Sequence, residues 1–219
     1  MRFRIAAQAA FALTLAAGAI VITPQRAHAA TPVVSGTGWK IVAPVITHID
    51  TKPWTIAFHD TGSRTKLTPY MRTVAAELSR DLHVKFTVTT RIVPVTRGKC
   101  TPAHTISLRY MSKPDPKDPK RSFTGACGNS ARAANGAYVY INADYWKAGS
   151  GVSEPSRRNL IWHEMGHAVG LAHPATCPRN SNGTQPIMCA VGNTGYHDYR
   201  SSRYTPWETT AFRHLIANR

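Results

Sequence analysis

The apolar positions of this chain change their spacing several times, and each spacing predicts a different element of structure. Between positions 68 and 82 the apolar residues recur at intervals of one, three and four: Met71, Val74, Ala75, Leu78 and Leu82. This spacing forms the apolar stripe of an amphipathic helix. Thr68 is a candidate N-cap with Pro69 at the first helical position, and residues 60–63 are typical of a turn. We therefore expect a helix over residues 68–82.

Other segments alternate apolar and polar residues, which predicts β-strands. Val84, Phe86 and Val88 alternate with polar residues in a half-buried strand that continues towards Val93. Further strands are expected at residues 54–59, 105–111 and 136–142. Prolines and charged residues gather at 112–121, which favours a surface loop.

The end of the chain carries a second helix signal. Thr205 is a candidate N-cap, Pro206 follows it, and Glu208 is placed to accept a hydrogen bond from the backbone N–H of the cap. This mixture of strands and helices predicts an α+β domain. We expect one catalytic domain over residues 53–219, preceded at 30–52 by an extended lead-in or a short propeptide without helical spacing.

The first 29 residues have the pattern of a signal peptide. Arg2 and Arg4 precede an apolar run from Ile5 to Ile22, and Ala27-His28-Ala29 has the small-x-small form that signal peptidases cut. The alternative is an uncleaved membrane anchor, since the run approaches the roughly 20 apolar residues that a bilayer requires. Gln8 interrupts the run and a cleavage pattern follows it, so we expect a secreted, extracellular protein without stable membrane insertion.

The chain is strongly basic. It has 27 Lys and Arg against 11 Asp and Glu, a formal charge of +16. Removal of residues 1–29 would take away three arginines and no acidic residue, which leaves 24 basic against 11 acidic side chains and a charge of +13. The basic residues are scattered without helix-turn-helix or zinc-finger spacing, so we expect no nucleic-acid partner. Attraction to anionic surface polymers remains possible in principle.

Four cysteines lie after the predicted signal peptide, where oxidation is permitted: Cys100, Cys127, Cys177 and Cys189. An even number favours disulfides, and four cysteines allow three pairings. We favour Cys100 with Cys127 and Cys177 with Cys189, because each bond would tie down one loop. Zinc binding by these thiols is less favoured, since no C-x-x-C spacing occurs.

One segment places three histidines and a glutamate within eleven positions. On a helix, His163 and His167 lie one turn apart on the same face, so both imidazoles can bind one zinc ion. Glu164 lies at the edge of that ion, where it can take a proton from a water. Gly170 can end the helix in a left-handed conformation, which brings His173 back as third ligand. Three protein ligands leave one position open, as in catalytic zinc sites. The alternative is a surface helix with a chance histidine pair.

With these residues the chain resembles the metzincin clan of zinc endopeptidases, whose signature H-E-x-x-H-x-x-G-x-x-H it matches from His163 to His173. The clan places a methionine-containing tight turn beneath the metal, and residues 185–189 resemble that turn. The resemblance implies that Met188 forms an apolar floor without binding the ion. It also implies a twisted mixed sheet with an antiparallel edge strand and helices, and a zinc cleft between an upper and a lower lobe.

In the clan, extended substrate pairs with the sheet edge formed by the last strand before the zinc helix. The resemblance therefore suggests four substrate contacts: Tyr138, Val139, Tyr140 and Ile141. Serralysins and astacins carry a tyrosine two residues beyond the methionine, and this chain has Ala190 there. Tyr196, Tyr199 and Tyr204 are alternative candidates for assisting the oxyanion, although each is more often a packing residue.

The remaining histidines lack ligand spacing, and we expect them to be exposed or hydrogen-bonded: His48, His59, His83, His104, His197 and His214. The sequence thus predicts a secreted, monomeric, zinc-dependent endopeptidase acting on protein or peptide substrates, with one catalytic Zn²⁺ and Glu164 as general base. One alternative is a noncatalytic secreted zinc protein that binds anionic cell-surface polymers. Another is a zinc amidase or aminopeptidase that hydrolyses small or cell-wall peptides.

Overall fold

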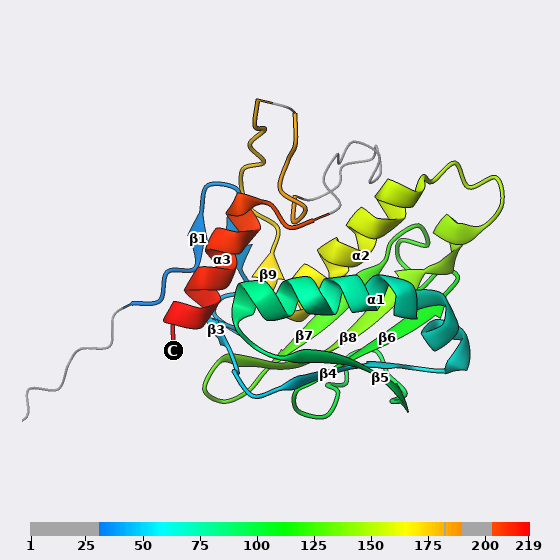
Figure 1. Ribbon diagram of the computed structural model, residues 1–219, viewed down its shortest axis with the longest axis horizontal. Coiled ribbons are helices and arrows are strands. Elements are labelled where there is room, and N and C mark those ends of the chain that lie inside the picture. The colour runs from blue at the N-terminus through cyan, green and yellow to red at the C-terminus, as the bar shows by residue number, and fades with distance from the viewer. Residues whose placement is uncertain (1–30, 182, 190–202) are drawn as a thin grey trace, which may run out of the picture. The chain divides into compact units, whose positions relative to one another are not determined.

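The structure of the protein is a computed structural model that describes residues 31–181, 183–189 and 203–219 (Figure 1). Every described element belongs to one compact unit, Thr31–Arg219. The predicted signal peptide, Ala190, Tyr196, Tyr199 and His197 lie outside the described residues. Within the described part of the chain, no helix combines the length and the apolar character required to cross a membrane.

The largest element of the described fold is a six-stranded mixed β-sheet. Five parallel strands follow the order β3 (His48–Ile49), β8 (Ala133–Asn142), β6 (Thr105–Met111), β4 (Trp54–Phe58) and β5 (Phe86–Ile92). A sixth strand, β7 (Phe123–Gly128), pairs antiparallel with β8. With three helices, this is a mixed α/β architecture that is compatible with the predicted α+β class.

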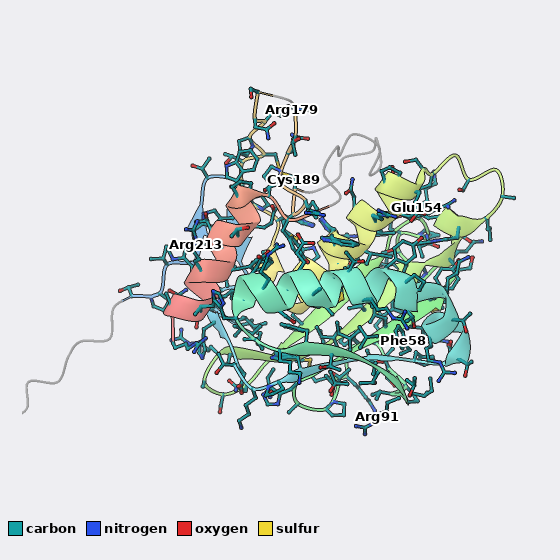
Figure 2. All side chains as sticks on the ribbon, in the orientation of Figure 1. Phe58, Arg91, Glu154, Arg179, Cys189 and Arg213 are labelled. Atoms are coloured by element: carbon teal, nitrogen blue, oxygen red, sulfur yellow. A yellow bond between two sulfur atoms is a disulfide. The ribbon has the colours of Figure 1, made fainter. Side chains whose placement is uncertain are left out.

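Helix α1 (Thr61–Leu82) crosses one face of the sheet (Figure 1). Its apolar stripe, represented by Met71, Val74 and Leu78, is fully buried in one core together with sheet residues such as Phe58 and Leu108. Each such side chain contributes about 1.5–3 kcal/mol by leaving water. Basic side chains such as Arg91 and Arg213 are instead exposed (Figure 2).

Helix α1 begins seven residues before the position predicted from the sequence. Asp60 is its N-cap, with Oδ1 accepting the Ser63 N–H at 2.6 Å, so the predicted turn at 60–63 is the first turn of the helix. Pro69 lies inside the helix, and the Thr68 hydroxyl donates to the Arg64 carbonyl at 2.6 Å. The Thr68-Pro69 pair resembled a helix start, but the aspartate cap about two turns earlier was the stronger signal.

The predicted edge strand lies inside the sheet. Strand β8 pairs with β6 on one side and with β7 on the other, so Tyr138, Val139 and Tyr140 have strand partners on both sides, whereas Ile141 pairs with β6. The antiparallel edge is β7, which the sequence analysis missed. Its residues include two glycines and lack apolar alternation, both of which weaken a strand signal. Gly125 is required there because a Cβ would overlap the ring of Tyr138.

Residues 31–52, predicted as an extended lead-in or short propeptide, belong to the same compact unit as the rest of the described chain. Strands β1 (Ser35–Gly36) and β2 (Trp39–Ile41) form a second small sheet with β9 (Leu171–Ala172). Asn218, just after helix α3 (Pro206–Ala217), bonds Val33 through its side chain. The predicted lead-in is thus held by both the zinc-motif segment and the C-terminal helix.

Both favoured disulfides are present. Cys100 bonds Cys127, and Cys177 bonds Cys189. The first ties the loop before β6 to the end of β7, and the second bridges the segment between His173 and the end of the Met188 turn. Bonds that close loops of this length typically stabilise a fold by about 2–4 kcal/mol, chiefly by restricting the unfolded chain.

Candidate metal centre

The central helix of the site, α2 (Glu154–Ala168), starts and stops at clear signals. Ser153 caps its N-terminus, with Oγ accepting the Ser156 N–H at 3.3 Å. At the other end Gly170 has φ +107°, which confirms the predicted left-handed turn. A Cβ at Gly170 would also meet the side chain of Ile46, so both conformation and packing require glycine.

Pairing between β2 and β9 fixes the course of the chain between Gly170 and His173. Ile41 pairs with Leu171 and Lys40 with Ala172, and the Val42 N–H donates to the Gly170 carbonyl at 2.9 Å. Two residues of β9 are therefore fixed immediately before His173. The N-terminal strands thus help to position a candidate ligand that lies about 130 residues further along the chain.

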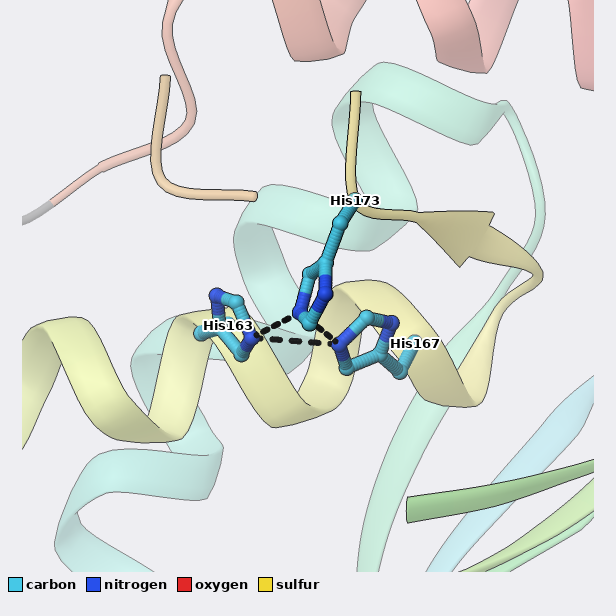
Figure 3. Close-up of side chains that lie close together, drawn as sticks. All are labelled: His163, His167 and His173. Atoms are coloured by element: carbon cyan, nitrogen blue, oxygen red, sulfur yellow. Dashed lines mark hydrogen bonds between the residues drawn. The ribbon is translucent and has the colours of Figure 1, made fainter. Parts of the chain in front are cut away.

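The three predicted ligands come together around one point (Figure 3). The Nε2 atom of His163 lies 3.0 Å from Nε2 of His173 and 3.1 Å from Nε2 of His167, and the His167–His173 separation is 3.1 Å. Ligand atoms around a tetrahedral ion with bonds of about 2.0–2.1 Å stand about 3.3–3.4 Å apart. The observed triangle is only slightly tighter than that spacing.

Hydrogen bonds fix the ring orientation of two of these histidines. Nδ1 of His163 lies 2.7 Å from the Ile187 carbonyl, and Nδ1 of His167 lies 2.8 Å from the Leu171 carbonyl. A carbonyl oxygen only accepts, so Nδ1 carries the proton in both rings and Nε2 presents a lone pair. Lone pairs that converge at this distance repel one another unless a cation lies between them. The donor set therefore fits a metal ion.

Burial keeps the three imidazoles neutral, as metal ligands must be. It lowers the pKa of His167 to about 4, and the pKa of His163 falls well below the usual value for the same reason. Burial also lowers the pKa of His173, and the positive charge of Arg121 acts in the same direction on all three.

Glu164 is buried beside this cluster, with 2% of its surface exposed. Burial raises the pKa of its carboxyl to about 7, while a hydrogen bond from Thr124 and the charge of Arg121 oppose that shift. The Thr124 hydroxyl lies 2.7 Å from Oε2 of Glu164 and 3.1 Å from its main-chain oxygen. Sequence analysis missed Thr124, because nothing in the sequence around it indicates that β7 runs beside α2.

Met188 packs against the backbone of α2. Its side chain is 1% exposed, and a Cβ at Gly166 would overlap its sulfur atom. Gly166 immediately precedes the ligand His167, so the methionine lies against the turn of helix that bears two of the histidines. A side chain larger than hydrogen at position 166 would displace Met188.

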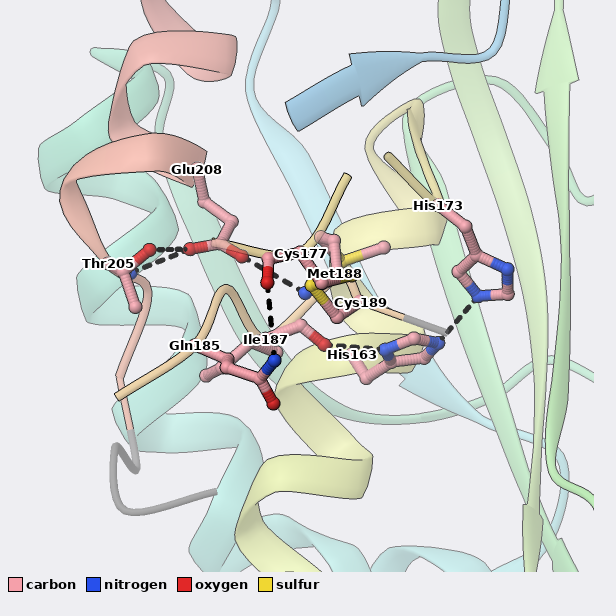
Figure 4. The surroundings of a disulfide bond; sticks show 9 residues. All are labelled: His163, His173, Cys177, Gln185, Ile187, Met188, Cys189, Thr205 and Glu208. Carbon is pink, nitrogen blue, oxygen red and sulfur yellow. Dashed lines mark hydrogen bonds between the residues drawn. A yellow bond between two sulfur atoms is a disulfide. The ribbon is translucent and has the colours of Figure 1, made fainter. Parts of the chain in front are cut away.

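A buried carboxylate joins the methionine turn to α3 (Figure 4). Oε1 of Glu208 accepts the Met188 N–H at 3.0 Å, and Oε2 accepts the Thr205 N–H at 2.8 Å and the Thr205 hydroxyl. The sequence predicted the capping box, and the structure confirms it. The bond to Met188 was not predicted, because it spans 20 residues.

The other candidate residues have different surroundings. Tyr204 is buried, and its hydroxyl donates to the Trp162 carbonyl at 2.9 Å; burial raises its pKa well above the usual value. This supports a packing role for Tyr204. Within the described residues, only His163, His167 and His173 converge as candidate ligands. His214, for example, stacks on Trp39.

A cavity of about 600 Å³ lies between α1 and the first half of α2, and none of the three histidines lines it. The candidate centre is thus defined by donor geometry rather than by cavity size. No protein-family model matches the chain, and no curated protein sequence shows a significant match to it.

Proposed function

We propose that the protein is a secreted zinc-dependent endopeptidase of the metzincin type. The observation that supports this proposal is the convergence of three histidine Nε2 atoms within 3.1 Å of one another, beside a buried glutamate. His163, His167 and His173 would hold the zinc ion. A bound zinc ion supplies a Lewis acid that polarises the scissile carbonyl and lowers the pKa of water.

Glu164 is the proposed general base. It takes a proton from the attacking water and passes it to the leaving amine, a role that requires a pKa near the working pH. The burial that raises its pKa to about 7 meets that requirement. The Thr124 hydroxyl, 2.7 Å from Oε2, holds the carboxylate in one orientation. Hydrolysis then needs no covalent acyl intermediate.

The proposed substrate position is the outer edge of β7. Within the described strands, β7 pairs only with β8, so the other side of its backbone is free for an extended peptide. Thr124 of this strand touches Glu164, which places the edge beside the proposed base. An extended segment of a protein substrate would pair with this edge.

Export follows from the predicted signal peptide and suits the two disulfides. We propose that the protein acts outside the cell as a monomer, with its scattered basic side chains providing nonspecific attraction to anionic polymers. Protein and peptide chains are the proposed substrates.

Casein hydrolysis by the purified protein tests the proposal. Glu164→Gln should abolish cleavage while one zinc ion per chain remains bound, and a chelator should abolish cleavage by the unmodified protein. Glu154→Gln is the matched control, because Glu154 lies on the same helix with an exposed side chain. A protein that binds zinc and cleaves neither casein nor short peptides would instead be a noncatalytic zinc protein. Release of terminal residues alone would indicate an aminopeptidase.

A further inference from the structure

Glu208 is fully buried, yet the proposed hydrolysis does not use it. A buried carboxylate is costly unless its oxygens accept hydrogen bonds. The capping box accounts for one oxygen, Oε2, which faces the N–H and hydroxyl of Thr205. The second oxygen, Oε1, leaves the helix and accepts the Met188 N–H at 3.0 Å. A helix cap does not require this second contact.

The Met188 N–H belongs to the same peptide group as the Ile187 carbonyl. That carbonyl lies 2.7 Å from Nδ1 of His163, so one planar group is bonded at its nitrogen by Glu208 and at its oxygen by the histidine (Figure 4). The imidazole then presents Nε2 to the other two histidines. The Glu208 carboxylate, the Ile187–Met188 peptide group and the His163 imidazole therefore form a continuous hydrogen-bonded relay.

We propose that Glu208 is a positioning residue for the candidate ligand His163, acting through the Ile187–Met188 peptide group. This inference rests on the metal-binding part of the proposed function and does not depend on peptide cleavage. Glu208 touches neither the ion nor the substrate.

The physical basis is polarisation along the peptide group. A carboxylate at the N–H draws the proton towards itself and increases the negative charge on the carbonyl oxygen, which strengthens its bond to the Nδ1 proton of His163. A stronger acceptor at Nδ1 makes Nε2 a better ligand and restricts rotation of the ring. Mutation of groups that hold a metal ligand through hydrogen bonds, without touching the ion, typically lowers metal affinity by roughly 10–100-fold.

The chain offers a matched comparison in Glu77 on α1. Glu77 is 5% exposed, and its Oε1 accepts the Tyr204 N–H at 3.0 Å, the same distance as the Glu208–Met188 bond. Its Oε2 accepts from Nε1 of Trp162 at 2.6 Å, so it also binds α2. Glu77 thus binds the residues immediately before His163 and Thr205 without touching the peptide group that His163 uses.

The first test compares Glu208→Gln with Glu77→Gln and Thr205→Val. Glutamine presents to the Met188 N–H either a neutral oxygen or an amide donor, and both weaken the bond. Thr205→Val removes the capping hydroxyl and leaves the Glu208–Met188 bond intact. We expect Glu208→Gln to weaken zinc affinity roughly ten-fold in competition with a chromogenic chelator. We expect the two controls to remain within about two-fold.

A second test uses the unmodified chain and does not require any variant to fold. If the hydrogen-bonded relay transmits polarisation, loading with zinc should shift the Met188 amide proton downfield in NMR spectra and slow its exchange with solvent. The Tyr204 amide, which donates to Glu77 over the same distance, is the internal control and should not shift.

The outcomes separate this inference from the proposed function. Loss of zinc affinity in Glu208→Gln alone, with a zinc-dependent shift of the Met188 amide, supports the relay even if the protein cleaves no peptide. Equal losses in Glu208→Gln and Glu77→Gln, or equal amide shifts at Met188 and Tyr204, would overturn it. Failure of the unmodified chain to bind zinc at all would overturn both the relay and the proposed function.

Discussion

The hydroxyl of Thr124 lies 2.7 Å from Oε2 of Glu164, although the two residues are 40 positions apart. One comes from the edge strand β7 and the other from helix α2. The contact joins the free edge proposed for substrate binding to the proposed general base, so it links two parts of one mechanism.

Thr124→Val should change the pH dependence of cleavage. The hydrogen bond from Thr124 lowers the pKa of Glu164, so its removal should raise that pKa above about 7. A general base works only when deprotonated, so the acid limb of the kcat/KM profile should move to higher pH, and kcat should fall roughly ten-fold. Thr210→Val, on the exposed side of α3, is the control. An unchanged acid limb would show that Thr124 does not act on the base.

The metal-free protein should lose stability on acidification. In the folded state burial holds the pKa of His167 near 4, below the unfolded value of 6.5, and lowers the pKa of His163 and His173 as well. At these three histidines protons therefore bind preferentially to the unfolded chain, so their contribution to the free energy of unfolding should fall as pH drops from about 6.5 towards 4. Glu164, whose pKa burial raises to about 7, contributes in the opposite direction and partly offsets this loss. Urea titrations across this range measure it.

Zinc should steepen this dependence, because protons and metal compete for the same nitrogens. The variant His167→Gln should flatten the curve, since it removes one titrating group. His83→Gln, with an exposed side chain, should leave it unchanged. The same pH dependence in His167→Gln and in the unmodified, metal-free protein would contradict the assignment of a neutral buried imidazole to His167.

Gly166→Ala should disturb the methionine beneath the ligands. The added Cβ would overlap the Met188 sulfur, and overpacking of this kind costs about 1–3 kcal/mol of unfolding free energy. Zinc affinity should fall too, because displacement of Met188 moves the turn that holds His163. Thermal unfolding and zinc competition measure the two effects. Gly62→Ala in the first turn of α1, where φ is not positive and a Cβ would lie 3.3 Å from Oδ1 of Asp60, should cost less than Gly166→Ala and leave zinc affinity unchanged. Equal effects at both positions would contradict this explanation.

A chain that begins at residue 53 should neither fold cooperatively nor bind zinc. It lacks β1–β3 and four buried apolar residues: Trp39, Ile41, Ile46 and Ile49. At about 1.5–3 kcal/mol each, their loss is comparable to the whole stability of a typical domain. It also removes the strand that fixes β9 before His173. A chain beginning at Thr31 is the control, and circular dichroism with zinc titration compares them. Tight zinc binding by the shorter chain would show that β2 is dispensable.

Local signals in the sequence determined much of this protein. The spacing His163, His167, Gly170 and His173 depends only on helix pitch and on the left-handed freedom of glycine, so the candidate ligands were predictable without a structure. The capping box of α3 was equally accessible because its partners lie three positions apart, and the two disulfides because four cysteines allow only three pairings.

Long-range pairing decided the rest. Strand β8 became an interior strand and β7 the edge, since strand order follows from hydrogen bonding between distant segments that composition does not encode. The pairing of β2 with β9, the Thr124–Glu164 contact and the Glu208–Met188 bond likewise join segments that the sequence keeps apart. The sequence by itself determined which side chains could hold a metal ion, whereas only the tertiary structure decided which groups hold those side chains in place, because packing brings together partners that no local spacing specifies.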